Sequence, residues 1–416
     1  MRWYWVALFA TGCAFQLRGV DVELAEDGGP PMEDLATDDM ASPPPDDLTG
    51  ADLSGVDLAM PPGDLPPAFT VTHVPQHYLT DGTCDLTVAT SIDTSALKVD
   101  GAAVPAGCTF TTEIVDGTLE VAVLAVRSLT ATDITVGGTR PLVVVAGTSI
   151  ALGKLDASGK LAVPGPGGYG PALGPGAGGN GQHAGSFADS GGGGAGYATV
   201  GGLGGVGNNP GQNAASGTAG TTQGTADLRL KAPGGSGGGK ISSEGCTVTG
   251  GGGGAGGGSI QLTAPTSIAI SAGINVGGGG GTGGCLMGNS NQGSGGGGGA
   301  GGSIYLESRA INVSGGLYAN GGGGGGGGSG DAGGHAGGNG GDGQPSTAQA
   351  IKGPKGGTFG GDGGLGGTAS APVKGDDADN GGGGGGSAGR IVVRSHGPAT
   401  VAIASPTPYL DTSVPP

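Results

Sequence analysis

The sequence predicts an all-β protein, a parallel β-helix whose coils are interrupted by glycine-rich insertions. In short segments after residue 119, apolar residues alternate with polar or small ones, which is the period of a strand with one buried face. One such unit recurs, because residues 295–328 have a near copy in residues 257–281. Glycine supplies 107 of the 416 residues, so stacked strands, rather than one large side-chain core, are the expected source of stability.

An export signal is expected before any folded part. Arg2 and the apolar run WYWVALFA that follows it are typical of a secretory signal. The tetrapeptide ATGC, which ends at Cys13, resembles the lipobox of bacterial lipoproteins, although that family prefers leucine at the position of Ala10. The resemblance implies a signal peptide over residues 1–12 and a diacylated Cys13 that anchors the protein in the outer membrane or at the cell surface. The alternatives are secretion without an anchor and an incidental cysteine in a buried segment.

Residues 13–67 are predicted to form a disordered, acidic, proline-rich linker. Residues 21–65 contain 13 acidic residues and neither lysine nor arginine, and Asp-Leu pairs recur there among the prolines. Like charges and prolines keep such a chain extended and solvated. We therefore expect the linker to hold the folded part away from a membrane. The formal charge of the whole chain, −17, offers no electrostatic basis for binding nucleic acid.

Residues 68–118 are predicted to form a β region, either a small sandwich or a cap on the coils that follow. Valine, threonine and isoleucine are frequent there, and Asp-Gly turns separate the expected strands. His73 and His77 have the spacing of two metal ligands on a helix. Pro75 lies between them, which predicts an extended segment and a structural role for both histidines.

Cysteine usage agrees with export. Without Cys13, four cysteines remain, an even number that in an exported chain favours disulfides over zinc ligation. The expected pairs are Cys84–Cys108 and Cys246–Cys285. Each would contribute roughly 3–4 kcal/mol in the chain-entropy model.

Residues 119–416 are predicted to contain the coils. Two runs, 119–138 and 139–159, each contain two or three short apolar-alternating strands. Similar strands return later in the chain, starting at Ala226, Ser259, Ser303, Arg390 and Thr400. We expect equivalent residues to stack from coil to coil. The expected rows are Ile260, Ile304 and Ile391 in the first strands, and Ile268 and Ile270 with Ile311 and Val313 in the second strands.

Glycine-rich insertions separate these strands, over residues 164–225, 234–258, 277–302 and 321–389. They resemble the glycine-rich regions of the anaplastic lymphoma kinase receptor family and of mycobacterial proteins with polymorphic glycine-rich repeats. The resemblance to the receptor family implies polyglycine II helices that pack side by side and hydrogen-bond laterally. Flexible loops are the alternative that composition alone favours.

The whole layout resembles glycine-rich surface lipoproteins of myxobacteria. The shared features are the Asp-Leu and proline spacer, the strand PLVVVA at residues 141–146, and glycine runs followed by GGSI units, the last ending in GRI at residues 389–391. The resemblance covers nearly the whole chain. It implies a location at the cell surface and no particular activity.

Motifs for catalysis are incomplete. Residues 234–241 approximate a phosphate-binding loop, but Ile241 stands where a serine or threonine should bind magnesium. β-Helix enzymes that act on polysaccharides need clustered carboxylates, whereas Glu307, Arg309 and Arg394 are isolated in outward strand positions. The best acidic cluster is Asp376, Asp377 and Asp379, a weak candidate for calcium because nothing fixes the ligand geometry.

We therefore expect a non-catalytic lipoprotein without a cofactor that acts as a structural scaffold or adhesin at the cell surface. Its expected partners are the membrane, through Cys13, and extracellular polysaccharide or the cell envelope. One alternative is a carbohydrate-active or carbohydrate-binding β-helix protein. Another is a binder of ice or mineral surfaces, which would need a flat and regular face.

Overall fold

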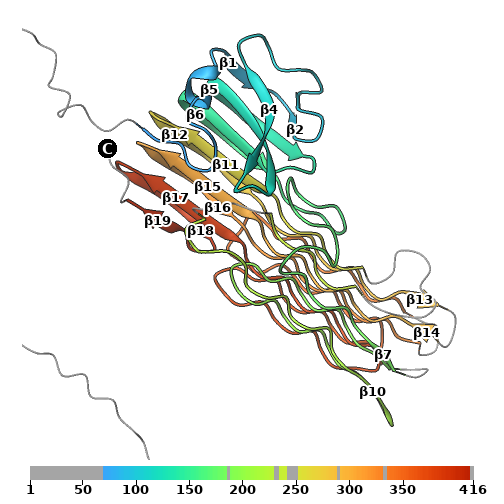
Figure 1. The fold of residues 1–416 in the computed structure, drawn as a ribbon. Coiled ribbons are helices and arrows are strands. Elements are labelled where there is room, and N and C mark those ends of the chain that lie inside the picture. The colour runs from blue at the N-terminus through green and yellow to red at the C-terminus, as the bar shows by residue number, and fades with distance from the viewer. Residues whose placement is uncertain are drawn as a thin grey trace, which may run out of the picture. The chain divides into compact units, whose positions relative to one another are not determined.

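The computed structural model describes residues 69–184, 188–228, 234–240, 252–287, 291–330 and 335–412. The predicted signal peptide, Cys13 and the linker lie outside these ranges. The described residues all belong to one unit, Leu65–Pro416, whose ribbon is coloured along the chain in Figure 1.

The described residues are all-β, as predicted, apart from the four-residue helix α1 (Tyr78–Asp81). Thirteen of their strands form one sheet. Its strands are β1 (Asp85–Val88), β2 (Ser91–Asp93), β3 (Lys98–Val99), β4 (Thr109–Val115), β5 (Leu119–Gly137), β6 (Leu142–Asp156), β11 (Ser259–Ala264), β12 (Ser267–Asn275), β15 (Ser303–Ser308), β16 (Ile311–Tyr318), β17 (Arg390–Ser395), β18 (Ala399–Ser405) and β19 (Tyr409–Asp411). Short hairpins are formed by β7 (His183–Ala184) with β8 (Ala188–Asp189), β9 (Gly207–Asn209) with β10 (Gln212–Ala214), and β13 (Leu286–Met287) with β14 (Asn291–Gln292). No helix in the described part of the chain has the length and hydropathy to cross a membrane.

Successive strand pairs stack in parallel with matching register. β11 pairs with β15, and β15 with β17, so that Ile260, Ile304 and Ile391 are neighbours. β12 pairs with β16, and β16 with β18, which places Ile268 beside Ile311 and Ile270 beside Val313. The predicted rows are therefore confirmed. They form because each unit repeats the same inward positions, so that parallel pairing brings equal side chains together.

The two runs after residue 119 differ from the prediction. Instead of two or three short strands each, they form single strands, β5 of 19 residues and β6 of 15. The first half of β6 pairs with β11 and its second half with β12. A register shift between Val126 and Ser128 bends the β5–β6 ladder, and a bulge of this kind turns a strand without ending it. Residues 226–228, expected to begin a strand, have no strand structure, and residues 229–233 lie outside the described ranges.

The main core lies between the inward rows of these strands. It contains the aliphatic residues of β11, β12, β15, β16 and β17 together with those of β5 and β6, almost all of them fully buried. β1 and β2 pair in parallel with β5, and β4 pairs with it antiparallel. The strands of residues 85–115 therefore belong to the same sheet. The Cys84–Cys108 disulfide, with its Cα atoms 5.1 Å apart, is present at this end.

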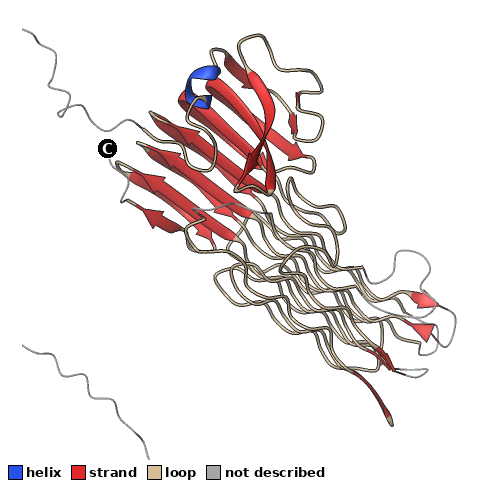
Figure 2. Cartoon of the chain, in the orientation of Figure 1, coloured by secondary structure: helices blue, strands red, loops and turns tan. Residues whose placement is uncertain are grey.

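The glycine runs leave the strands and continue side by side beyond them, as segments that are neither helix nor strand (Figure 2). Gly192 shows their hydrogen bonding: its N–H donates to the Gly295 carbonyl at 3.0 Å, and its own carbonyl accepts from the Gly384 N–H at 2.9 Å. A Cβ atom on Gly192 would lie 2.3 Å from the carbonyl oxygen of Gly239. The runs thus satisfy their backbone groups laterally, at a spacing that leaves no room for a side chain.

Candidate functional site

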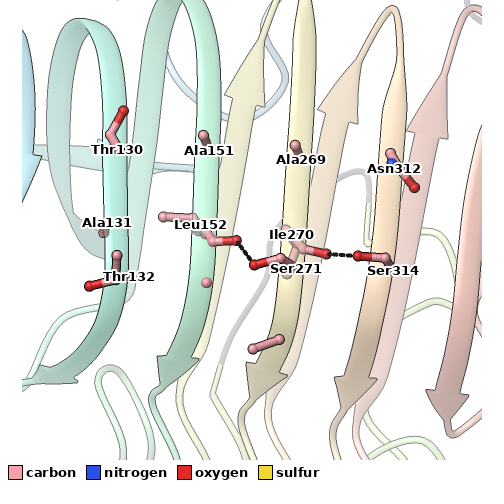
Figure 3. Close-up of a pocket in the computed structure, with 12 residues that line it drawn as sticks. Thr130, Ala131, Thr132, Ala151, Leu152, Ala269, Ile270, Ser271, Asn312 and Ser314 are labelled. Atoms are coloured by element: carbon pink, nitrogen blue, oxygen red, sulfur yellow. Dashed lines mark hydrogen bonds between the residues drawn. The ribbon is translucent and has the colours of Figure 1, made fainter.

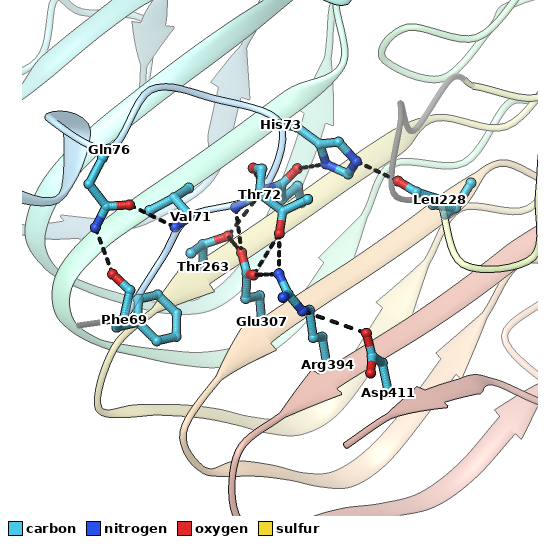
Figure 4. Close-up of polar contacts among 11 residues, drawn as sticks. Phe69, Val71, Thr72, His73, Gln76, Leu228, Thr263, Glu307, Arg394 and Asp411 are labelled. Carbon is cyan, nitrogen blue, oxygen red and sulfur yellow. Dashed lines mark hydrogen bonds and ion pairs between the residues drawn. The ribbon is translucent and has the colours of Figure 1, made fainter. Parts of the chain in front are cut away.

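A buried polar cluster lies on the outer face of β11, β15 and β17, beneath residues 69–77, which we call the strap (Figure 4). Glu307 and Arg394, expected to be isolated, are direct neighbours in the β15–β17 ladder. The Glu307 Oε1 atom lies 2.6 Å from Arg394 Nη1. Both occupy the fifth position of their strand units, SIYLE and RIVVR. Parallel register therefore brings them together, and aligning the two units is the signal that could have revealed the pair.

The strap completes the environment of Glu307. The Thr72 backbone N–H donates to Oε2 at 3.0 Å and the Thr72 hydroxyl donates to Oε1 at 2.7 Å. The Thr263 hydroxyl donates to Oε2 at 3.3 Å. Glu307 is only 1% exposed, so its charge is stabilised by these donors and by Arg394 rather than by water. Burial would lower the pKa of Arg394, but the charge of Glu307 and the neighbouring Tyr305 outweigh it and raise that pKa.

His73 fastens the strap beside this pair. Its Nδ1 lies 2.7 Å from Gln261 Oε1, and Gln261 Nε2 donates to the Thr72 carbonyl at 2.8 Å. The other ring nitrogen of His73 faces the backbone carbonyl of Leu228. Its ring packs edge-on against Tyr305, with the ring centroids 5.0 Å apart. Burial raises the pKa of the Tyr305 phenol to about 12.

His77 lies apart from His73. It precedes α1 and pairs with Asp81 at 3.5 Å. The extended segment predicted around Pro75 is therefore wrong at its end, since the helix begins at Tyr78 and the Tyr78 N–H reaches the Pro75 carbonyl at 3.3 Å. Pro75 lies two residues ahead of the N-cap residue His77, so its ring and its missing N–H do not disturb the helix. The structural role expected for His73 agrees with its contacts to Gln261, Leu228 and Tyr305, which join the strap to the rest of the fold.

A trough of about 560 Å³ lies on the outer face of β5, β6, β12 and β16 (Figure 3). Its lining is uncharged. Most of it consists of small or hydroxyl-bearing residues, and Leu152, Ile270 and Asn312 complete it. The β12–β6 ladder shifts register between Ile270 and Gly273, and the β16–β18 ladder between Val313 and Gly316. The trough lies at these bulges, whose positions the alternating pattern did not reveal.

Two carboxylates of the acidic cluster Asp376, Asp377 and Asp379 have partners within the glycine-rich part. Asp377 pairs with Lys374 at 2.7 Å and accepts the Val206 N–H at 2.7 Å. Asp379 accepts from the Asn209 side-chain amide at 3.0 Å. Burial would raise the pKa of Asp377, but its bond to Lys374 lowers it overall. Asp376, together with Asp377 and Asp379, lines a cavity of about 250 Å³. Among the described residues, no group of three or more His, Cys, Asp or Glu side chains could hold a metal ion.

The second expected disulfide is described only at one end. Cys285 is disulfide-bonded. Cys246, its expected partner, lies outside the described residues.

No protein-family model, curated protein or solved structure matches this chain.

Proposed function

We propose that this protein is a non-catalytic scaffold or adhesin, anchored at the outer membrane or cell surface through a lipid on Cys13. The observation that carries the proposal is the hydrogen-bonded continuity of parallel strands with glycine runs, in which backbone groups link segments far apart in sequence. Backbone hydrogen bonds of this kind make the described glycine runs and strands one ordered body that can present fixed surfaces. We further propose that the stacked strand pairs are coils of a parallel β-helix and that the glycine runs are polyglycine II helices.

The buried polar cluster supports a structural rather than catalytic role for its ionisable groups. Glu307 accepts hydrogen bonds from two threonines and pairs with Arg394, and the strap covers it. A general acid or base has to reach its substrate within hydrogen-bond distance. The carboxylate of Glu307 instead holds the strap on the sheet.

Anchoring is tested by labelling cells with radioactive palmitate and fractionating their membranes. We expect label on the full chain and its loss, with release from the membrane fraction, for Cys13→Ala. A Thr11→Ser variant, which keeps the cysteine and a small residue, is the matched control. Unchanged labelling and fractionation of Cys13→Ala would refute the anchor. Attachment of cells to polysaccharide-coated surfaces, compared between producing and deleted strains, tests the adhesin role.

A second candidate function, binding of a neutral carbohydrate, is favoured by the trough. Hydroxyl and amide groups alternate there with methyl groups, and none of the lining residues is charged, a composition that suits an uncharged polyhydroxylated ligand. Binding to neutral and acidic polysaccharides should be compared for the parent and for Ala269→Arg, which fills the trough. Ala348→Arg, at an exposed position elsewhere, is the control. Equal binding by both variants would exclude the trough as the carbohydrate-binding site.

An ice- or mineral-binding function has less support. The row of residues in register across the trough is mixed, since Thr130, Ala151, Ala269, Asn312 and Thr400 follow one another on neighbouring strands. A regular surface would repeat one side chain along such a row.

A further inference from the structure

The two ends of the strand stack differ. At the upstream end, β1, β2 and β4 pair with β5, and Phe110 and the Cys84–Cys108 disulfide pack against the core. At the downstream end, β18 and β19 are the last strands of the order, and no strand in the described ranges pairs with their outer edges (Figure 1). Stacked-repeat proteins require a polar cap at each end of the stack. In the part of the chain that the structure describes, this stack therefore has one end covered by further strands and one end without such a cover, which we call the open end.

The open end exposes large apolar side chains. β18 has no charged residue, whereas natural edge strands commonly carry charges that prevent pairing with another chain. Ile403 is 45% exposed there and Leu410 is 58% exposed. Leu410 also ends a core row, because Leu306 neighbours Val393 and Val393 neighbours Leu410 in the ladders. The core thus continues to the surface at this end.

We propose that β18 and β19 form a self-association surface through which two copies of this chain join end to end. The end presents two strand edges at once, with an apolar row between them. A second copy presents the same two edges at the same separation, whereas one added foreign strand would cover only one edge. The strands form two layers, one that ends at β18 and one that ends at β19. A twofold axis perpendicular to these two layers pairs β18 with β18 of the second copy, and β19 with β19, in antiparallel fashion. It also directs the glycine-rich segments of the two copies away from each other.

The distribution of charged residues also favours this end for contact between two copies. The chain carries a formal charge of −17, so two copies repel each other over most approaches. β18 is uncharged, and Asp411 of β19 lies 3.6 Å from Arg394. Asp411 shares Arg394 with Glu307 and is only 6% exposed, so contact through this end brings no exposed carboxylate of β18 or β19 together.

The test measures the oligomeric state of the full chain carrying Cys13→Ala, so that acyl chains do not contribute. Sedimentation equilibrium over a wide concentration range should show a monomer–dimer equilibrium. Ile403→Lys places a lysine of each copy at the contact and should weaken dimerisation about tenfold or more, because like charges that face each other at an interface repel. Ile351→Lys makes the same substitution at an exposed isoleucine of the glycine-rich part and should leave the dimer unchanged.

A monomer at every concentration overturns the proposal, as does an Ile403→Lys variant that dimerises like the parent. If Ile403→Lys does not give the β-type circular dichroism of the parent, Thr400→Lys replaces it, since Thr400 is exposed on the same strand. A dimer that persists in Thr400→Lys likewise refutes the proposal that β18 and β19 form the contact. Equal loss of dimer in Ile351→Lys and in the edge variant would show a general charge effect and would also refute it.

Discussion

The carboxylate of Glu307 and the guanidinium of Arg394 lie 2.6 Å apart, although 87 residues separate them in the chain. Parallel register between β15 and β17 brings them together, and the strap closes over them through Thr72. The pair links two strands of the stack to the segment that enters it. The contribution of the pair to the free energy of unfolding can be measured, because removing one partner leaves the other charge buried.

Arg394→Met should lower the free energy of unfolding by about 3–5 kcal/mol, since Glu307 then keeps a buried charge without its cation. The double variant Glu307→Leu/Arg394→Met should lose less than Arg394→Met alone. Urea unfolding of the full chain measures both. Lys154→Met, which breaks the exposed pair with Asp133, is the control and should have a much smaller effect. A double variant that is less stable than Arg394→Met would contradict the buried-pair account.

Leu306 tests the core rows. It is fully buried between Leu262 and Val393 in the ladders, so Leu306→Ala should destabilise the protein by about 2–5 kcal/mol. Leu203→Ala, at a leucine that is 44% exposed, should cost far less. Thermal and urea unfolding of the parent and of both variants measure these two losses of stability. Similar losses for both would show that the strand stack does not dominate stability.

The glycine runs should reject even a methyl group. A Cβ atom on Gly297 would lie 2.0 Å from the Gly193 carbonyl oxygen, whereas on Gly170 it would meet only a Leu173 methyl group at 3.8 Å. Gly297→Ala should therefore destabilise the bundle by about 1–3 kcal/mol or more, as overpacking does, and Gly170→Ala should be nearly neutral. Hydrogen exchange of the glycine amides, followed by NMR, reports on the runs directly. Unchanged protection in Gly297→Ala would argue against close lateral packing.

Asp100 should make stability depend on acid pH. Its carboxylate accepts the backbone N–H groups of Ala89, Thr90 and Ser91 at 2.8–2.9 Å. These bonds lower its pKa from the usual 3.8 to about 2. A depressed folded-state pKa contributes stability above the unfolded-state value and loses it as pH falls through the folded-state value.

Asp100→Asn is the matching variant, because the residue has a φ of +50°, which asparagine tolerates. It should be less stable than the parent at neutral pH, and the difference should shrink between about pH 4 and pH 2. Unfolding curves collected at several pH values give the difference directly. A gap that stays constant down to pH 2 would exclude the carboxylate as its source.

The alternating pattern and the repeated units determined the strand class and the stacking partners in advance. Ile260, Ile304 and Ile391 occupy equivalent positions in their units, so parallel pairing of the units makes them neighbours. Both signals are local, since each depends on the periodicity of a few consecutive residues. The even number of cysteines, and the position of two of them within one predicted β region, named Cys84 and Cys108 as partners, which the disulfide confirms.

Only the tertiary structure decided what the outward side chains meet. Glu307 was expected to be isolated because nothing in its own unit shows that the strap, more than two hundred residues earlier, covers it. The trough depends on bulges in β12 and β16, and the open end depends on which strand comes last in the stack. These features arise from contacts between distant segments, whereas period and composition report only on neighbours along the chain.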